Sequence, residues 1–378
     1  MKAAITLLAL VMLLLMSDFA QSQVAGGTGK LGYQLGLYGR VRLDVPVYPT
    51  TRQLDRLSFV VALNSSSVFD YTEDAENVEP PSRTTGGIAD TIATVLIDNS
   101  FSHLEPNVQV RVTVYSWHND DFFIVKYTTT NIHTSPYTLH LGAFAIPKPS
   151  NAYGGETVSY DATKKVSYFF RTAQNPYIGL KVLSGDPFSF HALDWDVYSP
   201  TNPDADEATD SMRYQMTASP GFDGPLTAGV NGSAFNLNAG ERTIAPGDSA
   251  TVYYAVLYTT SLSDMLLEAD SAQIRYNGTF TGVEPVAFDV PDGFALSQNY
   301  PNPFNPETRI AFAVKTSALT TLKVYDLLGR EVATLVDEYL APGSYAVSFS
   351  GDGLASGTYV YTLTAGSYRE TRRMVLVR

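Results

Sequence analysis

From about Gly32 to Tyr258, hydrophobic and polar residues alternate with a period of two. The clearest stretch is Asn107–Trp117, in which valines at every second position share one face. Such alternation is typical of half-buried β-strands, whereas helices repeat with a period near 3.6. Clusters of Asn, Asp, Pro and Gly separate several further runs of this kind. The pattern predicts an antiparallel β-sandwich, with one hairpin pairing Val108–Trp117 with Phe122–Ile132 across four polar residues.

One segment departs from this alternation. Residues Leu262–Tyr276 place apolar side chains at helical spacing, and Ser261 or Ser263 can act as the N-cap. We expect one short amphipathic helix there, at the end of an acidic β-sandwich domain that covers residues 23–276. Residues 277–293 mix Gly, Pro, Thr and Val without a firm period, which is typical of a linker.

A second strand pattern begins at residue 294 and continues to residue 378. Six or seven short strands in about 85 residues match the size and rhythm of an immunoglobulin-like sandwich. The fold class predicted for the whole chain is therefore all-β. A large antiparallel β-sandwich is followed by a small immunoglobulin-like one.

The first 22 residues have the layout of a secretory signal peptide. Lys2 precedes an apolar run from Ala3 to Met16, and small residues follow at Ala20 and Ser22. The apolar run is shorter than the roughly 20 residues that a membrane-spanning helix needs. We expect cleavage after Ser22, with an uncleaved anchor as the alternative. No other segment is apolar enough to span a bilayer, so we expect no transmembrane segment in the mature protein.

Charge and cysteine content exclude several classes of function. The 378-residue chain has a formal net charge of −13, of which residues 286–378 carry only −1 and the central region −12. An acidic body of this kind repels phosphate backbones, so nucleic acid is not an expected partner. The chain has no cysteine. Disulfides and cysteine-based metal or nucleophile sites are therefore impossible, and stability has to come from packing.

A cluster of prolines marks the start of the second domain, in the sequence LSQNYPNPFNPETRI at Leu296–Ile310. Proline fixes φ and pushes the preceding residue into extended geometry. The cluster therefore predicts a stiff, polyproline-like strap, with Tyr300 and Phe304 available to pin it against a neighbouring surface.

The proline segment, together with LKVYDLLGREVATLV at Leu322–Val336, LASGTYVYTLTAG and the closing RRMVLVR, resembles the type A C-terminal sorting domain of type IX secretion cargo. That domain is similar to the immunoglobulin-like domain of flagellar hook-capping proteins. FSGDGLASG lacks the Trp that family members often carry before the Gly-rich turn. The residues that carry the resemblance are Asn299, Pro301, Asn302, Pro303, Phe304, Asn305, Pro306, Gly329, Gly357, Arg372 and Arg373.

The resemblance implies an export route. The protein would enter the periplasm of a Gram-negative bacterium by its leader and be recognised there by the type IX secretion machinery. It would then be released into the medium or attached to the outer cell surface as the sorting domain is cleaved. The last strand, with Arg372 and Arg373, would be the end that the machinery recognises. The alternative is that the module only stabilises the protein.

The central domain carries no local catalytic motif. None of its five histidines stands in an HExxH or similar spacing, and no GxSxG or P-loop is present. Trp117, Trp195 and many tyrosines suggest a sugar-stacking platform, although alternating aromatics in strands are more often core. Long runs of this domain loosely resemble the supersandwich domains related to galactose mutarotases. No catalytic or cofactor-binding residue can be transferred from that resemblance.

The acidic loop before Arg213 is a candidate calcium site. Asp204, Asp206 and Asp210 stand at offsets three, five and nine of a calcium-loop register. However, the register has Glu207 where a Gly is needed and Arg213 where a bidentate Glu is needed. The alternative is a solvated acidic loop. Calcium is the only cofactor that the sequence suggests.

Three hypotheses for the central domain follow. In the first, the sandwich has a non-enzymatic binding or structural role, with an extracellular glycan as a candidate partner. In the second, the protein is a secreted carbohydrate-active enzyme, which requires a pocket holding two carboxylates beside Trp117 or Trp195. In the third, it is a surface adhesin or filament subunit with exposed edge strands.

Overall fold

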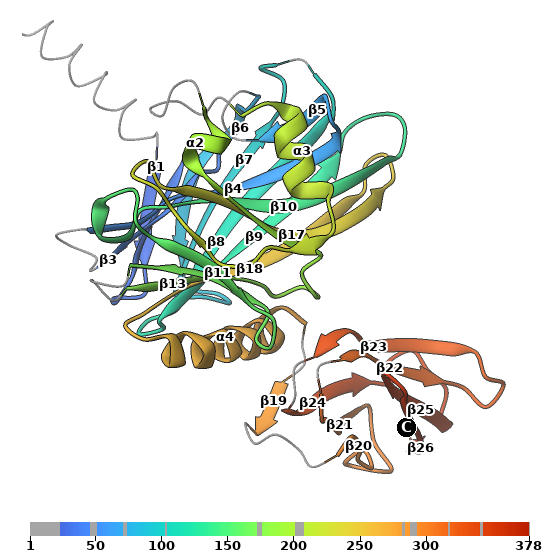
Figure 1. Ribbon diagram of the computed structural model, residues 1–378. Coiled ribbons are helices and arrows are strands. Elements are labelled where there is room, and N and C mark those ends of the chain that lie inside the picture. Colours follow the sequence, from blue (N-terminus) through green and yellow to red (C-terminus); the bar gives the residue numbers. More distant parts are fainter. Residues whose placement is uncertain are drawn as a thin grey trace, which may run out of the picture. The chain divides into compact units, whose positions relative to one another are not determined.

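The computed structural model describes residues 23–45, 51–70, 74–102, 104–171, 176–200, 208–281, 284–287, 293–316, 318–340 and 343–377 (Figure 1). The chain divides into two compact units, Met1–Ala269 and Asp270–Arg378, which are described separately below. The predicted signal peptide and its cleavage site at Ser22 lie outside the described residues. Among the described helices, none has the length and apolar character that a membrane span requires.

The first unit contains two large sheets. The first sheet has the order β1-β2-β3-β4-β10-β17-β14-β15, and β5 also pairs with β4. Its pairs are antiparallel except β14 with β15. Its strands are β1 (Gln23–Gly27), β2 (Gly32–Gly36), β3 (Val41–Val45), β4 (Thr51–Asn64), β5 (Ser67–Asp70), β10 (Tyr137–Pro147), β14 (Ser189–Asp194), β15 (Gly221–Phe222) and β17 (Ser233–Ile244).

The second sheet has the order β16-β11-β12-β13-β18-β9-β8-β7-β6. Its strands are β6 (Glu76–Thr85), β7 (Thr91–Asp98), β8 (Val108–Ser116), β9 (Phe122–Asn131), β11 (Thr157–Asp161), β12 (Val166–Phe170), β13 (Tyr177–Val182), β16 (Leu226–Thr227) and β18 (Ser249–Thr259). β8 and β9 form the predicted hairpin, in which Val108 pairs with Asn131. The valines that alternate along β8 are fully buried. The all-β sandwich predicted from the period-two pattern is confirmed.

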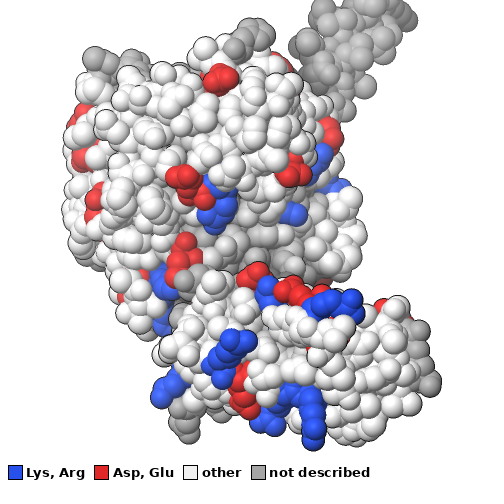
Figure 2. Space-filling model, turned by 90° about the vertical axis from the view of Figure 1, so that its right-hand side faces the viewer, with Lys and Arg blue, Asp and Glu red and all other residues white. Residues whose placement is uncertain are grey.

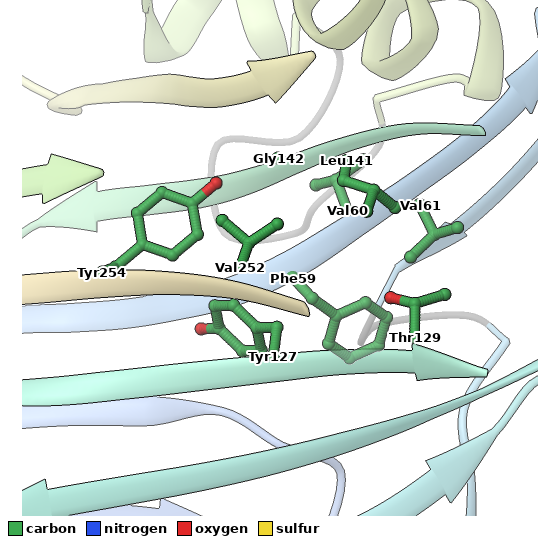
Figure 3. Close-up of a pocket in the computed structure, with 9 residues that line it drawn as sticks. All are labelled: Phe59, Val60, Val61, Tyr127, Thr129, Leu141, Gly142, Val252 and Tyr254. Carbon is green, nitrogen blue, oxygen red and sulfur yellow. The ribbon is translucent and has the colours of Figure 1, made fainter. Parts of the chain in front are cut away.

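The main core lies between the two sheets. Leu57, Phe59 and Val61 of β4 pack there with the buried face of β8, β9 and β18. A small cavity remains between β4, β9, β10 and β18 (Figure 3). Figure 3 shows that aliphatic and aromatic side chains form most of its wall, including Val252 and Tyr254. The cavity is therefore a gap in the core packing, with few groups that a polar ligand needs.

Two helices cover the outer face of the first sheet. They are α2 (Trp195–Tyr198) and α3 (Asp210–Ala218), which lie on the side of β4, β10 and β17 that faces away from the second sheet (Figure 1). A second apolar cluster, with Val60, Phe144 and Met216 among its members, fills this interface. The pattern of hydrophobic residues did not predict these two helices.

A buried ion-pair network lies under α3. Asp70 accepts from Arg56 at 3.3 Å, and its Oδ2 lies 2.9 Å from Nε of Arg213. All three side chains are almost fully buried. Removing one member of such a network leaves an uncompensated charge, which typically costs about 3 to 5 kcal/mol. The network therefore fixes α3 to the sheet.

The predicted helix is α4 (Leu262–Tyr276), and its bounds agree with the sequence prediction. The hydroxyl of Ser261 accepts from the backbone N–H of Asp264 at 3.1 Å, as an N-cap does. Met265, Ala269 and Ala272 form its buried face. A Cβ at Gly179 of β13 would lie 2.5 Å from the sulfur of Met265, so glycine allows α4 to approach the second sheet. A π-helical turn, Asn277–Thr281, follows α4.

The second unit consists of two four-stranded sheets. One has the order β19-β24-β21-β20 and the other β23-β22-β25-β26. Their strands are β19 (Glu284–Ala287), β20 (Ala295–Leu296), β21 (Glu307–Val314), β22 (Ala318–Tyr325), β23 (Glu331–Leu340), β24 (Gly343–Ser350), β25 (Gly357–Ala365) and β26 (Tyr368–Leu376). The small sandwich expected from the sequence is present, with its own core cluster. β19 lies within the stretch interpreted as a linker. The exact domain boundaries stay a prediction.

A pH effect on stability follows from Asp74, which lies near Asp70 and Asp210. Burial is the main cause that raises the pKa of Asp74 to about 6, with an additional contribution from the Asp70 charge. A carboxyl group with a raised pKa in the folded state destabilises the protein as pH rises from its unfolded pKa through about 6. Asp74→Asn should remove this loss of stability. The melting temperature of the variant minus that of the wild type should therefore be larger at pH 7 than at pH 4.5, by at least about 2 °C.

Thermal unfolding followed by circular dichroism at both pH values measures this difference. Asp248→Asn, at an exposed position, is the matched control and should follow the wild type. Parallel pH profiles of the wild type and Asp74→Asn would contradict the assignment.

Candidate functional site

The proline segment begins at a buried asparagine. The side-chain amide of Asn299 donates to the carbonyl of Pro301 at 3.0 Å and to the hydroxyl of Thr308 at 2.9 Å. The backbone N–H of Asn299 donates to the hydroxyl of Tyr361, which itself donates to the carbonyl of Ser297. Asn299 thus joins the proline segment to β21 and to β25, one strand in each sheet.

The next residues bind the last strand directly. The backbone N–H of Phe304 donates to the carbonyl of Val375 at 2.9 Å, and the N–H of Val377 donates to the carbonyl of Phe304 at 3.0 Å. The side-chain oxygen of Asn302 accepts from the N–H of Val375 at 2.9 Å. Phe304 and Leu376 form a parallel bridge. The segment therefore pairs with the outer edge of β26 over its last residues.

The expected pair of anchoring aromatics is only half correct. Phe304 is 2 % exposed and packs against Phe349 in the core, whereas Tyr300 is 82 % exposed. Backbone hydrogen bonds with Arg309 hold Tyr300 instead. The chain also bends at residues 301–303, and the peptide bonds before Pro301 and Pro303 are cis. The segment is thus a bent connection rather than the extended polyproline strap that the sequence predicted.

The other residues of the motif have different environments. Gly329 has a φ of 78° in the turn between β22 and β23, where Asp326 accepts from the N–H groups of Leu328 and Arg330. Gly357 begins β25. Arg372 donates to Glu370 at 2.8 Å, and Arg373 is exposed while its carbonyl accepts from Gln298. Asn305, Pro303 and Pro301 are exposed, and the carbonyl of Pro306 accepts from Gly351.

Comparison with known families agrees with this geometry. Residues 298–377 match the family model of the secretion system C-terminal sorting domain. The second unit is therefore a sorting domain, as the proline motif indicated. This domain indicates export by the type IX secretion machinery, and thus a secreted or cell-surface location.

The chain is similar to several solved structures at low identity. A polysaccharide lyase shares 11% identity with a TM-score of 0.39, and the match covers 94% of this chain and 47% of the lyase. A bacterial glucoamylase complexed with acarbose shares 14% identity with a TM-score of 0.47, over 68% of this chain and 35% of the glucoamylase. A galactose mutarotase-like protein from Clostridium acetobutylicum shares 6% identity with a TM-score of 0.37, over 63% of this chain and 95% of that protein.

The chain thus spans less than half the length of the lyase and about a third of that of the glucoamylase. Likenesses of this strength do not define an activity. No match was found among curated protein sequences.

Both tryptophans lie in the core, which is the role that the sequence favoured over a sugar-stacking platform. Trp117 and Trp195 are each only 8 % exposed. The indole N–H of Trp117 donates to the carbonyl of Ile88, and Trp195 packs with Tyr198 in the cluster under α2. Both rings therefore serve the core, and the alternative of a stacking platform does not hold for these two residues.

The calcium candidates are only partly described. Asp204 and Asp206 lie outside the described residues. Asp210 is the first residue of α3, lies 3.9 Å from a guanidinium nitrogen of Arg213 and accepts from the N–H of Val68 at 3.4 Å. In the described part of the chain, no group of three or more His, Asp and Glu side chains is arranged to hold a metal ion. Calcium binding by these three aspartates stays a prediction.

Carboxylates near the helix-covered face hold loops and caps. Asp194 accepts from the N–H of Asp196 at 3.0 Å and from that of Gly229 at 2.7 Å. Asp223 accepts from the N–H of Ala192 at 3.0 Å and lies 3.3 Å from a ring nitrogen of His191. These contacts join α2, β14 and the loops beside them, so the carboxylates act in the architecture of this face.

Glu156 is the most deeply buried carboxyl group of this region. Burial raises its pKa, and its Oε1 accepts from the hydroxyl of Ser233 at 2.8 Å. A guanidinium nitrogen of Arg171 lies 4.0 Å from Oε2. Among the described residues, Glu156 is fully buried in a packed interior.

Arginine side chains gather where the helices do not cover the first sheet. Arg52 donates to Asp44 at 2.7 Å and to Asp55 at 3.3 Å, and Arg40 donates to the same Asp55. Arg42 lies 3.9 Å from Asp55. The sequence analysis did not identify this group. Its signal was the density of arginines between residues 40 and 56 of an otherwise acidic domain.

A prediction concerns the bond between Asn302 and the last strand. Asn302→Ala removes the acceptor of the Val375 N–H. Loss of a hydrogen bond with a net contribution of about 1 kcal/mol should make local opening of β26 roughly fivefold more frequent. Hydrogen–deuterium exchange of peptides covering β26 should therefore accelerate. Asn305→Ala, an exposed neighbour in the same motif, is the matched control and should exchange like the wild type. Equal exchange in both variants would contradict the role of Asn302.

Proposed function

We propose that the protein is a type IX secretion cargo whose central β-sandwich is a binding module for an extracellular glycan. The sorting domain at residues 298–377 supports the export half of this proposal. The organisation of the central unit supports glycan binding without catalysis. The main observation is that α2 and α3 cover the outer face of the first sheet.

Closure of this face disfavours an enzyme of the two-carboxylate type. Such an enzyme needs a general acid and a second carboxylate about 5 to 10 Å apart across an open site. Here Asp194 and Asp223 satisfy backbone N–H groups, and Glu156 lies in the interior. A binding module needs only a surface with polar and aromatic groups, which the margin of the first sheet offers.

The export half predicts the effect of losing β26. Deletion of residues 369–378 removes the strand that Asn302 and Phe304 bind, so the protein should accumulate in the periplasm. Immunoblots of medium, surface and periplasmic fractions measure its distribution. Asp248→Asn, at an exposed position of the central unit, should be exported normally. Normal export of the deletion would overturn the assignment of β26 as the recognised end.

If the central unit is a binding module, it should bind a glycan without cleaving the glycan chain. The full chain should bind at least one class of bacterial, plant or algal glycan on an array, with and without calcium. Size-exclusion chromatography of the glycan after incubation should show an unchanged length distribution. New reducing ends would favour the carbohydrate-active enzyme instead, and a blank array would refute glycan binding.

A further inference from the structure

The margin of the first sheet carries an organised basic surface, and its members are Arg40, Arg42, Arg52, Lys148 and Tyr153. Arg42 and Gln34 form a cross-strand pair of β3 and β2, on the face that α2 and α3 cover further along the sheet. Arg52 lies at the start of β4 and donates to Gln34 at 3.4 Å. The three guanidinium groups retain 19 to 29 % of their side-chain exposure. They are held in place but remain accessible.

Two carboxylates hold these arginines from below. Asp44 and Asp55 are 2 % and 11 % exposed in their side chains, so they lie beneath the guanidinium groups. Burial acts to raise the pKa of Asp55, but Arg40 and Arg42 outweigh it, and the pKa is lowered. Asp55 therefore remains ionised at neutral pH. Three guanidinium groups over two carboxylates leave a net positive charge at this margin.

Tyr153 and Lys148 extend the basic surface. The ammonium group of Lys148 lies 4.6 Å from the ring centroid of Tyr153, and the Tyr153 side chain lies close enough to Asp55 to lower the pKa of that carboxyl group. The ring remains 43 % exposed. A tyrosine ring presents a flat apolar face at low entropic cost, and such faces stack on sugar rings.

The charge of the whole protein does not cancel this local field. In the view of Figure 2 the charged side chains form separate groups on a largely uncharged surface. At physiological ionic strength the screening length is about 8 Å, so distant acidic residues act weakly on a ligand at this margin. A guanidinium also matches a carboxylate in two parallel hydrogen bonds, which an ammonium cannot do.

We propose that Arg40, Arg42, Arg52, Lys148 and Tyr153 form a binding site for a glycan that carries carboxylates, namely a polymer of uronic acids. The arginines bind the carboxylates, and Tyr153 stacks on a sugar ring. This inference rests on the proposed glycan-binding function and specifies its ligand class.

The test measures binding of the full chain to oligogalacturonate by isothermal titration calorimetry at about 0.15 M salt. Arg42→Gln and Lys148→Gln should each weaken binding about tenfold, because a hydrogen bond to a charged group contributes about 1.5 kcal/mol. Tyr153→Ala should weaken it by a similar factor. Lys148→Gln leaves every guanidinium–carboxylate pair in place, so it tests the site even if Arg42→Gln unfolds.

Two matched controls come from the second sheet. Lys126 lies over the ring of Tyr253 at 5.6 Å, as Lys148 lies over Tyr153, and Arg111 is a partly exposed strand arginine paired with Glu79. Lys126→Gln and Arg111→Gln should bind oligogalacturonate within about twofold of the wild type. Equal losses in the controls and in the variants of the basic surface would overturn the proposal.

Other ligands separate this proposal from its alternatives. Neutral cello-oligosaccharides should bind at least about tenfold more weakly than oligogalacturonate. Binding of neutral but not acidic glycans would overturn the uronate site while the glycan-binding function survives. Equal binding of polyglutamate or duplex DNA would overturn it in favour of nonspecific polyanion binding. Binding of no glycan at all would refute both proposals.

Discussion

The first sheet has an apolar outer face, and the need to cover it determines the organisation of the central unit. β4 and β10 present Val60 and Phe144 on the side away from the second sheet, and α2 and α3 cover them with Trp195 and Met216. Exposure of such a face to water costs about 25 cal/mol for each Å² of apolar area. The described part of the face is therefore closed over these strands. On the same face, charged side chains replace the apolar ones at β2, β3 and the start of β4.

An equivalent constraint acts on the sorting domain, where the last strand lies at a sheet edge. Prolines at 301, 303 and 306 have no N–H group, so few backbone donors remain in the segment between residues 300 and 306. Tyr300 donates to Arg309 of β21, and Phe304 donates to Val375 of β26. These two strands belong to different sheets. The proline segment thus connects β21 of one sheet with the edge strand β26 of the other, so the beginning and the end of the sorting domain are held together.

Much of this fold could be predicted from the sequence because strand alternation and one helical period are local signals. The alternating valines of β8 and the spacing of α4 both depend only on near neighbours along the chain. α3 was missed because its stability comes from distant partners. Arg213 is buried against Asp70, and Asp210 accepts from the N–H of Val68, 142 positions away. A short segment with a buried arginine has no amphipathic pattern that separates it from a loop.

The basic surface could not be predicted because it also depends on contacts between residues that are distant in the sequence. The same contacts order its side chains, which favours binding. The strand register brings Arg42 beside Gln34, and the loop after β10 carries Lys148 and Tyr153 to the same margin. Asp44 and Asp55 then fix the guanidinium groups from the buried side. Side chains that are already ordered lose less entropy when they bind, so a small number of contacts yields more affinity. A flexible basic loop of equal charge lacks this advantage, which makes the buried aspartates part of the binding surface although no ligand reaches them.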